Sequence, residues 1–374
     1  MNCDLDINLN LNLYLNLNLN LNLDLNLRKL KIKIFKSPNL IIFKSPNPLN
    51  LELTSTLILL GISCLLLLIL DSLVAVMLWL TLKVTFRKAF LWGLLSLALP
   101  PLFFAYGYLV ERNWTQVRNV EIATPTLPHT FNGYRVVQIS DIHLRSFKGR
   151  ERTLQKMVDK INSLNPDIIC FTGDLVTMSP DEIEGFQTIL STLHTKDGVF
   201  SVMGNHDYMI YAGKGAPRTN PSIAIKQLQE AERQMGWTLL LDSNSLIRRG
   251  SDCIAIVGVE NISTSRHFPS KGNLAKALQG SEGAFRILLS HDPTHWDSQV
   301  SYRTDIPLTL SGHTHATQCT LLGWCPGKYI YPHYKGHYSQ GNQHLYVNIG
   351  LGETIFPARV GTRPEITLIT LRDE

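Results

Sequence analysis

The sequence predicts an α/β domain that follows an apolar, membrane-spanning N-terminal region. Residues 111–374 alternate strand-like apolar runs with amphipathic helical stretches, a pattern typical of sheets packed inside layers of helices. Residues 56–82 and 89–110 are almost free of charge, and both exceed the roughly 20 apolar residues that span a bilayer. Only 17% of the 374 residues are charged, against about 25% in soluble proteins, so part of the chain does not face water.

Charge and cysteine content exclude several classes of protein. The net charge is +5, but residues 1–110 hold nine basic and five acidic side chains, which leaves +1 for the remainder. We expect no nucleic-acid partner, because the domain offers no basic stripe. Six cysteines in this length exclude a disulfide-dense scaffold. Cys319 and Cys325 form either a disulfide or two free thiols.

The N-terminal 50 residues read as a tail without a folded core. Residues 1–27 alternate Leu with Asn, which we interpret as low-complexity sequence, with a sticky amphipathic strand as the alternative. Residues 28–50 are basic and broken by proline, as in a juxtamembrane tail. We therefore divide the chain into a tail (1–50), a membrane anchor with about two helices (51–110), a linker (111–130) and a folded domain (131–374).

Two features of the anchor affect how its helices are built. Asp71 is the one charge in 56–82, and we favour a break between shorter helices or a position near the headgroups over an intramembrane polar site. The pair Pro100-Pro101 predicts a kink in the second span.

The orientation of the anchor follows from the placement of basic residues. Lys83, Arg87 and Lys88 lie between the spans, and the positive-inside rule then places that loop in the cytoplasm and the domain outside. The basic residues at 28–44 favour the opposite arrangement, because two spans return the chain to the same side. We favour a domain outside the cytoplasm.

Eight strands and two helices are expected in the domain. Alternating or continuous apolar runs bounded by turn residues predict the strands, and apolar residues at helical spacing predict helices at Arg152–Leu164 and Ile183–Leu193. The predicted strands are Tyr134–Ile139, Asp167–Phe171, Gly198–Val202, Cys253–Val259, Phe285–Leu289, Pro307–Leu310, Leu345–Ile349 and Glu365–Leu371.

Five short polar segments each follow one of these strands. They are Asp141-Ile142-His143, Gly173-Asp174, Gly204-Asn205-His206-Asp207, Ser290-His291-Asp292 and Gly312-His313-Thr314-His315. Each alone has an ordinary interpretation as a turn, a surface polar group or a core histidine. Together, at strand ends where α/β folds bind ligands, they indicate a metal site.

The chemistry of these side chains favours two ions. Imidazole with carboxylate suits Mn, Fe, Zn or Ni, and seven or eight ligands are too many for one ion but fit a two-metal phosphoryl-transfer site. Asp174 is the natural bridge, because a carboxylate has two oxygens. Gly173, Gly204 and Gly312 precede ligands at tight turns, where a side chain would obstruct the ion or strain the backbone.

The order of the segments resembles the calcineurin-like metallophosphoesterase superfamily. It is similar in particular to a membrane-associated bacterial branch that opens with Ile139-Ser140-Asp141-Ile142-His143-Leu144 and closes with Leu345-Tyr346-Val347-Asn348 and Arg363-Pro364-Glu365-Ile366. The resemblance covers roughly Phe131 to Leu371. It implies two packed mixed β-sheets flanked by helices in four layers.

The resemblance also implies a role for each site residue. One divalent ion (Mn²⁺, Fe²⁺/Fe³⁺ or Zn²⁺) would be held by Asp141, His143, Asp174 and His315, and a second by Asp174, Asn205, His291 and His313. His206 would be the general acid for the leaving oxygen rather than a ligand, and Asp207 would orient it. One departure concerns the loop after the last ligand, where Ala316 and Thr317 stand in place of two glycines of the branch; the departure affects loop shape and substrate fit.

We therefore expect an integral protein of a bacterial cytoplasmic membrane that hydrolyses a phosphomonoester or phosphodiester through a metal-activated hydroxide. A lipid-linked or envelope compound is a candidate substrate. The resemblance implies a nucleotide-linked diacylglucosamine as one such compound, and that substrate would require a site at the cytoplasmic face. Tyr208, Tyr211, Lys214 and Arg218 lie in either a substrate loop or a simple surface loop. The alternative function is a non-catalytic membrane scaffold with a structural metal site.

Overall fold

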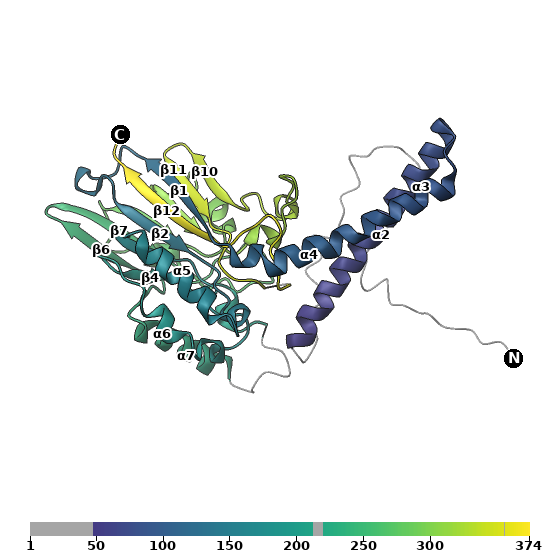
Figure 1. Cartoon of the computed structure of the whole chain (residues 1–374). Helices are drawn as coiled ribbons and strands as arrows, with labels where there is room; N and C mark the ends of the chain where they lie inside the picture. The colour runs from purple at the N-terminus through teal and green to yellow at the C-terminus, as the bar shows by residue number, and fades with distance from the viewer. Residues whose placement is uncertain (1–47, 212–219, 355) are drawn as a thin grey trace.

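The computed structural model describes residues 48–211, 220–354 and 356–374, and in them two β-sheets flanked by helices form the domain (Figure 1). The first sheet contains, in spatial order, β1 (Gln116–Ala123), β12 (Glu365–Arg372), β2 (Arg135–Ile139), β3 (Ile168–Phe171), β4 (Val199–Ser201) and β5 (Thr238–Leu239). The second contains β10 (Gly336–Gln340), β11 (Gln343–Val347), β9 (Leu308–Ser311), β8 (Phe285–Leu289), β7 (Asp252–Gly258) and β6 (Ser243–Arg249).

Both sheets are mixed, which confirms the predicted fold class. In the first, β2, β3, β4 and β5 are parallel to one another, while β12 is antiparallel to β2. In the second, β7, β8, β9 and β11 are parallel, and the edge strands β6 and β10 are antiparallel to their neighbours. Parallel strands end at the same edge of a sheet, so the loops that follow β2, β3, β4, β8 and β9 lie close together.

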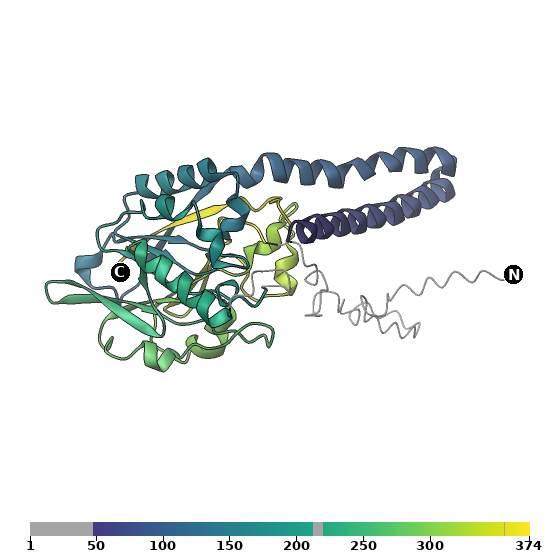
Figure 2. The ribbon, with the colours of Figure 1, turned by 90° about the horizontal axis from the view of Figure 1, so that it is seen from below.

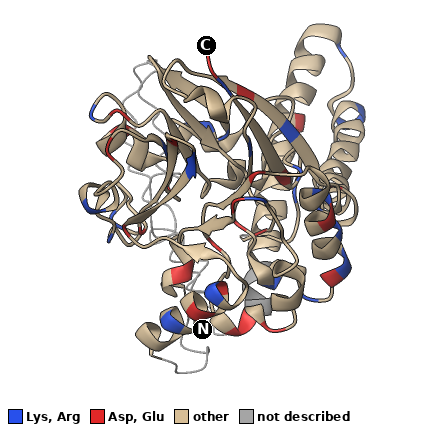
Figure 3. Ribbon diagram, turned by 90° about the vertical axis from the view of Figure 1, so that its left-hand side faces the viewer, with Lys and Arg blue, Asp and Glu red and all other residues tan. Residues whose placement is uncertain are grey.

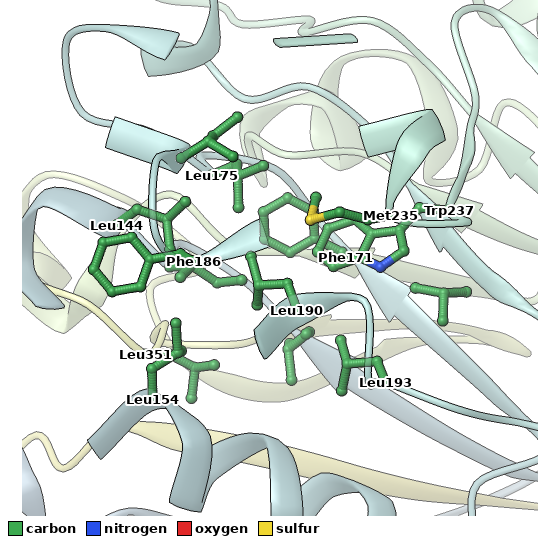
Figure 4. Close-up of a cluster of buried hydrophobic side chains, with 14 of the residues drawn as sticks. Leu144, Leu154, Phe171, Leu175, Phe186, Leu190, Leu193, Met235, Trp237 and Leu351 are labelled. Carbon is green, nitrogen blue, oxygen red and sulfur yellow. The ribbon is translucent and has the colours of Figure 1, made fainter. Parts of the chain in front are cut away.

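Three apolar clusters hold the layers together. The first packs the outer face of the first sheet against α5 (Glu151–Ser163), α6 (Gln187–Leu190) and α7 (Pro221–Gln234), and Figure 4 shows part of it, including Phe171 and Trp237. A second cluster lies between the sheets, and a third covers the outer face of the second sheet beneath α8 (Leu274–Ala277). Alternation assigns Val136 to the second cluster and Val137 to the first, as the two-residue period of a strand requires.

All eight predicted strands are present, with ends within two residues of the prediction. The helix predicted at Arg152–Leu164 is α5, in which Leu154, Met157, Val158 and Ile161 form the buried stripe. The prediction of one helix at Ile183–Leu193 is wrong. A 3₁₀ turn at Pro180–Ile183 and the single turn of α6 replace it, because Gly185 adopts a left-handed φ of 83° that ends the first turn.

The strands β1, β5, β6 and β10 and the helices α7 and α8 were not predicted from the sequence. The start of α7 carries a readable signal, since Asn220 caps it by accepting the N–H of Ser222 (3.0 Å) and Pro221 occupies its first turn. Strand β1 lies within residues 111–130, which were expected to be a linker, and it pairs along its whole length with β12. Its residues are mostly half-buried or exposed, so the apolar pattern of a strand is weak there.

Two long apolar segments precede the domain and extend from one end of it (Figure 2). The first is α2 (Pro48–Leu82); the second comprises α3 (Phe86–Gly93), a 3₁₀ stretch (Leu94–Ala98) and α4 (Leu99–Leu109). Thr54–Leu82 and Phe86–Asn113 are long and apolar enough to cross a membrane. Residues 1–47, which hold the low-complexity leader and the basic tail, lie outside the described residues.

The predicted break at Asp71 is wrong, because α2 continues through it without interruption. Asp71 instead accepts a hydrogen bond at Oδ2 from Ser96 Oγ on the second segment (2.6 Å). Gly93 allows this approach, since a Cβ there would lie 2.9 Å from that of Asp71. Polar contacts between close-packed helices are typical of membrane segments, so the carboxylate is satisfied between the helices.

The prolines of the second segment lie at a helix start rather than at a mid-helix kink. Pro100 and Pro101 occupy the first turn of α4, where a missing N–H breaks no helical hydrogen bond. The irregularity predicted there is the 3₁₀ stretch that precedes them.

The end of the second apolar segment is built into the domain. Glu111 and Arg112 are both buried, and Arg112 pairs with Glu353 (Nη2 to Oε2, 3.2 Å) and donates to the Pro357 carbonyl (2.8 Å). Glu111 accepts the backbone N–H of Gly361 (2.7 Å). These contacts hold the helix pair in one orientation relative to the sheets.

Candidate metal centre

The five polar segments meet at one edge shared by both sheets. Asp141 donates its N–H to the Gly173 carbonyl (2.9 Å), and Gly312 donates its N–H to the His291 carbonyl (2.9 Å). Gln138 on β2 donates to the Ser311 carbonyl on β9 (2.8 Å), which joins the two sheets just behind the segments. The predicted convergence of strand ends therefore occurs.

Asp141, His143 and His315 form the first cluster of candidate ligands. His315 Nε2 lies 3.1 Å from Asp141 Oδ1 and 3.1 Å from His143 Nε2. Each of the three side chains is buried and offers one ligand atom within 4.8 Å of the others. Two imidazole nitrogens face each other at hydrogen-bond distance, an arrangement that suits a shared cation.

Asp174, His291 and His313 form the second cluster, with Asn205 beside it. His291 Nε2 lies 3.1 Å from Asp174 Oδ2, 3.0 Å from Asn205 Oδ1 and 3.3 Å from His313 Nδ1. The same Asp174 oxygen is 3.6 Å from His143 Nε2 in the first cluster. Asp174 thus lies between the two clusters, where a carboxylate is able to contact both.

His206 lies beside both clusters and is partly exposed. Its Nδ1 is 2.9 Å from the Thr177 carbonyl, and because a carbonyl only accepts, that nitrogen carries the proton and Nε2 carries the lone pair. The His206 backbone N–H donates to Asp174 Oδ1 (2.8 Å). His143, Asp174 and His206 form a third group with ligand atoms within 4.8 Å of one another.

Asp207 contacts the backbone of the site. Its buried carboxylate accepts N–H groups from Asp174 (2.8 Å), Leu175 (2.9 Å), Val176 (3.1 Å) and Gly204 (2.9 Å). The ring of His206, which Asp207 was expected to orient, is held by the Thr177 carbonyl. Asp207 therefore shapes the loops that carry Asp174 and Asn205.

Three glycines allow the loops to approach the ligand atoms. A Cβ at Gly204 would lie 2.2 Å from Asp174 Oδ1, and one at Gly312 would lie 2.3 Å from Asp141 Oδ2. Gly173 has a φ of 96° and would collide with the Gly204 backbone at 2.5 Å. All three were predicted to need the absence of a side chain.

The electrostatics of the cluster favour the metal-binding protonation state of Asp141, Asp174 and His143. Burial raises the pKa of Asp141, but the charge of His315 and its hydrogen bond outweigh burial and hold that pKa below its usual range. The charges of His291 and His206 do the same for the pKa of Asp174. Burial lowers the pKa of His143 well below its usual value. Ionised carboxylates and neutral imidazoles are the forms that bind metals.

His291 differs from the other imidazoles. Burial alone would lower its pKa, but the charge of Asp174 and the hydrogen bond to it raise the pKa to about 10. Its Nδ1 lies 2.7 Å from the Thr172 carbonyl, so Nε2 is the atom directed at Asp174. A carbonyl partner of this kind orients a metal-binding imidazole.

The loop after His315 adopts a glycine-like backbone without glycine. Ala316 and Thr317 have φ of 46° and 54°, a region that costs energy for residues with a Cβ. The buried Gln318 side chain donates to the carbonyls of Phe356 (2.7 Å) and Ala358 (2.9 Å) and accepts the N–H of Thr354 (2.8 Å). These bonds hold the strained loop in place.

Several residues that surround the clusters were not predicted from the sequence; Tyr211 was predicted, as part of either a substrate loop or a surface loop. Tyr331 Oη lies 3.0 Å from His313 Nε2, Phe268 packs edge-on against the His313 ring, and Tyr211 lies 4.2 Å from the ring of His206, centroid to centroid. Buried Arg359 lies 3.4 Å from His315 Nδ1. None belongs to a short motif, so only their chain distance from the ligands is visible in sequence. Of the expected substrate-loop residues, Lys214 and Arg218 lie outside the described residues; Cys319 and Cys325 are both free thiols.

Comparisons with known proteins identify the family. A family model described as calcineurin-like phosphoesterase matches residues 134–317. A metallophosphoesterase of Bacillus subtilis, YkuE, is 32% identical over 280 residues, which cover 71% of this chain and 90% of that protein. The chain belongs to the calcineurin-like phosphoesterase family. Members of this metallophosphoesterase family use divalent metals, so the chain is a metal-dependent phosphoester hydrolase.

Two further metallophosphoesterase relatives bear on the N-terminal helices and the substrate. A transmembrane protein with metallophosphoesterase domain from Danio rerio is 31% identical over 286 residues, or 74% of this chain and 62% of the relative, so the chain spans about three fifths of that protein. UDP-2,3-diacylglucosamine pyrophosphatase LpxG of Chlamydia trachomatis is 28% identical over 263 residues, or 60% of this chain and 76% of LpxG. With the two apolar helices, these relatives indicate association with a membrane.

Proposed function

We propose that this metallophosphoesterase is an integral membrane enzyme with two divalent ions, Mn²⁺, iron or Zn²⁺, at the edge shared by its sheets. The observation that carries the proposal is the position of Asp174 Oδ2 between two clusters, 3.1 Å from His291 Nε2 and 3.6 Å from His143 Nε2. The division into tail (1–50), anchor (51–110) and catalytic domain (131–374) is part of the proposal. Residues 111–130, expected to be a linker, are counted with the domain because their strand β1 pairs with β12.

The donor set fits such a pair of ions. Asp141, His143 and His315 would hold one and Asn205, His291 and His313 the other, with Asp174 shared. The loops approach so closely that a Cβ at 204 would collide with Asp174 and one at 312 with Asp141, so glycine at both positions lets the candidate ligands come together. When bound, two divalent ions offset phosphate charge and lower the pKa of water.

The residues of the chain then supply orientation and a proton. Thr177 keeps the proton of His206 on Nδ1, so a second proton on Nε2 is available for a leaving oxygen when the ring is protonated. The pKa of His206 is lowered by burial, while Asp174 and the Thr177 carbonyl raise it. His206 is partly exposed, as a group that meets substrate must be. A general acid of this kind contributes about 10²–10⁴-fold.

We propose that the substrate is a phosphomonoester or phosphodiester, with a lipid-linked or envelope compound as the leading class. The apolar helices and the name of the LpxG relative support that class. On this proposal the membrane is the bacterial cytoplasmic membrane and the domain lies outside the cytoplasm. A diacylglucosamine nucleotide would require the opposite orientation.

Metal content and turnover test the proposal together. We expect the purified full chain to hold two transition ions per protein by elemental analysis, and Asp174→Ala to hold at most one and to lose turnover of p-nitrophenyl phosphate and bis-p-nitrophenyl phosphate. Asp159→Ala, an exposed carboxylate on α5, is the matched control and should keep both ions. Metal content unchanged in Asp174→Ala would exclude the shared-ligand role.

The alternative is a non-catalytic membrane scaffold whose metal is structural. The candidate ligands and His206 are all present, so this alternative is the weaker one. Bound ions without turnover of either p-nitrophenyl substrate, with and without added Mn²⁺, would favour it.

A further inference from the structure

One loop carries most of the exposed apolar side chains of the domain. Among the described residues from 116 onward, eight large apolar side chains are exposed, and five of them lie in ten consecutive residues: Leu321, Leu322, Trp324, Tyr329 and Ile330. We name residues 321–330 the apolar loop. Exposed apolar residues scattered singly are ordinary, but a group this close in space marks an interaction surface.

The fold imposes this exposure. Leu321 and Trp324 exchange backbone hydrogen bonds (both 2.9 Å), so Leu322 and Gly323 form the tip of a tight turn. Leu322 has a φ of 49° and is 100% exposed, although turns of this shape favour Asn, Asp or Gly at such positions. At full exposure the Leu322 side chain packs against none of the described residues, so its apolar surface is free for a partner.

The apolar loop begins beside the apolar helices. Thr320, just before the loop, donates its N–H to the Val360 carbonyl (2.7 Å). Residues 356–360 pack on α4, where a Cβ at Gly107 would lie 2.7 Å from the Arg359 carbonyl oxygen and the ring of Phe104 lies 6.3 Å from that of Phe356. In Figures 1 and 2 the yellow-green loops lie at the end of the domain from which α2 and α4 extend.

We propose that the apolar loop is a second membrane contact that enters the headgroup region of the bilayer holding the two apolar helices. Its composition fits that layer, since Trp324, Tyr329 and Lys328 are the residue types that gather at membrane interfaces, and Lys328 Nζ lies 4.9 Å from the Tyr329 ring centroid. A lipid surface is favoured as the occupant because the loop is continuous with the segment that docks the membrane helix.

The contact places the metal centre at the lipid surface. Tyr331 directly follows the apolar loop and its hydroxyl lies 3.0 Å from His313 Nε2. On the other side, Arg359 lies 3.4 Å from His315 Nδ1 through Nη2 and 3.5 Å from the Gly107 carbonyl through its backbone N–H. One residue, Tyr331 or Arg359, therefore separates each candidate cluster from a membrane-facing element. A phosphoester carried by a lipid would reach the ions without leaving the bilayer, an extension that rests on the proposed function.

Photo-cross-linking in a bilayer tests the contact without relying on activity. The full chain is reconstituted in nanodiscs of phosphatidylcholine and phosphatidylglycerol with p-benzoylphenylalanine at Tyr329, at Leu322 or at Tyr302. Tyr302 is the matched control, because it is exposed (75%, against 59% for Tyr329). Its backbone N–H donates to the Gln343 side chain at the start of β11, at the opposite end of the strands from the candidate metal centre. Leu322 is fully exposed, and Tyr329 is mostly exposed and contacts Trp324 and Lys328 of the same loop, so the substitutions leave the core intact. Thermal unfolding in detergent checks each variant.

We expect lipid adducts by mass spectrometry at positions 322 and 329, at least tenfold above position 302. Equal yields at all three positions, or adducts to a second copy of the chain at 322 and 329, would overturn the proposal. Turnover of bis-p-nitrophenyl phosphate by the same preparations reports separately on the proposed function, so a failure of the hydrolase assignment and a failure of the membrane contact give different results.

Discussion

Buried carboxylates in two regions of this protein have pKa values shifted in opposite directions. At the candidate metal centre, Asp141 and Asp174 are surrounded by imidazoles that hold their pKa below the usual range. On α7, Glu232 is equally buried, but its partner is a single hydroxyl, Ser201 Oγ at 2.5 Å, and burial together with the charge of Asp207 raises its pKa to about 8. Burial is the same in both regions, so the neighbours decide whether a carboxylate is ready to bind a cation.

Asp71 gives a third example within the apolar helices. It too accepts a hydrogen bond from one serine, Ser96, and no further His, Asp or Glu is grouped with it among the described residues. A lone hydroxyl satisfies a carboxylate, whereas several imidazoles aimed at it prepare a metal site. The surface charge carries no such information, since basic and acidic residues are interspersed on the face of the domain in Figure 3.

Replacement of His206, an imidazole near Asp174, is expected to give the largest change in activity. We expect His206→Ala to lower kcat for p-nitrophenyl phosphate about 10²–10⁴-fold, because the proton donor is lost, while both ions stay bound because all the proposed ligands remain. Elemental analysis and steady-state kinetics measure the two quantities. Full activity would remove His206 from its role, and loss of an ion would make it a ligand.

The Asp207 carboxylate sharpens the comparison, because it lies at the candidate metal centre yet has a pKa raised to about 7 by burial and by the charge of Asp174. It is satisfied by four backbone N–H groups instead of imidazoles. Asp207→Asn presents an amide N–H₂ to some of those donors, and each buried unsatisfied group costs about 1–3 kcal/mol. We expect the unfolding temperature in detergent to fall by about 5–10 °C, against no change for Asp159→Asn. An unchanged unfolding temperature would show that the loops are stable without the hydrogen bonds to the Asp207 carboxylate.

The pH dependence of stability tests the raised pKa of Glu232, the buried carboxylate that is hydrogen-bonded to a serine hydroxyl rather than to an imidazole. An unfolded glutamate ionises near pH 4.5 and the folded one near 8, so the folded state loses stability as pH rises through that interval and the loss is complete above pH 8. Glu232→Gln removes the ionisation, and we expect it to be about 1–2 kcal/mol more stable than the parent at pH 9 and no more stable at pH 4. The buried amide donor that Gln adds offsets part of the gain.

Thermal unfolding at several pH values measures this difference. Glu230→Gln, an exposed neighbour on the same helix, is the control and should show no pH-dependent gain. A gain for Glu232→Gln that is the same at pH 4 and pH 9 would contradict the assigned ionisation.

The smallest expected change in stability comes from the contact between the two apolar helices. Ser96→Ala removes the hydrogen bond to Asp71, and such bonds in membranes contribute about 0.6 kcal/mol. We expect a decrease of about 1–2 °C in unfolding temperature in lipid bicelles. Ser63→Ala, whose hydroxyl bonds only the Leu59 carbonyl of its own helix, is the control. Equal decreases for both would show that the contact between helices adds nothing.

Much of the architecture was predictable because its signals are local. The apolar runs of Tyr134–Ile139 and Phe285–Leu289, bounded by turn residues, identify strands, since a strand buried on both faces has a nearly continuous apolar sequence. The convergence of the candidate ligands Asp141, Asp174 and His313 was also predictable, because they follow strands that end at one edge. The two apolar spans needed only length and absence of charge.

Other features required the tertiary structure. Arg359 and Tyr331 reach His315 and His313 from segments that carry no motif, and the backbone contacts of Asp207 depend on how two loops cross. The exposure of Leu322 reverses what its apolar side chain predicts. Local sequence determines which residues are apolar, polar or turn-forming, but the packing of two sheets and a helix pair decides which of them meet, because those contacts join positions far apart in the chain.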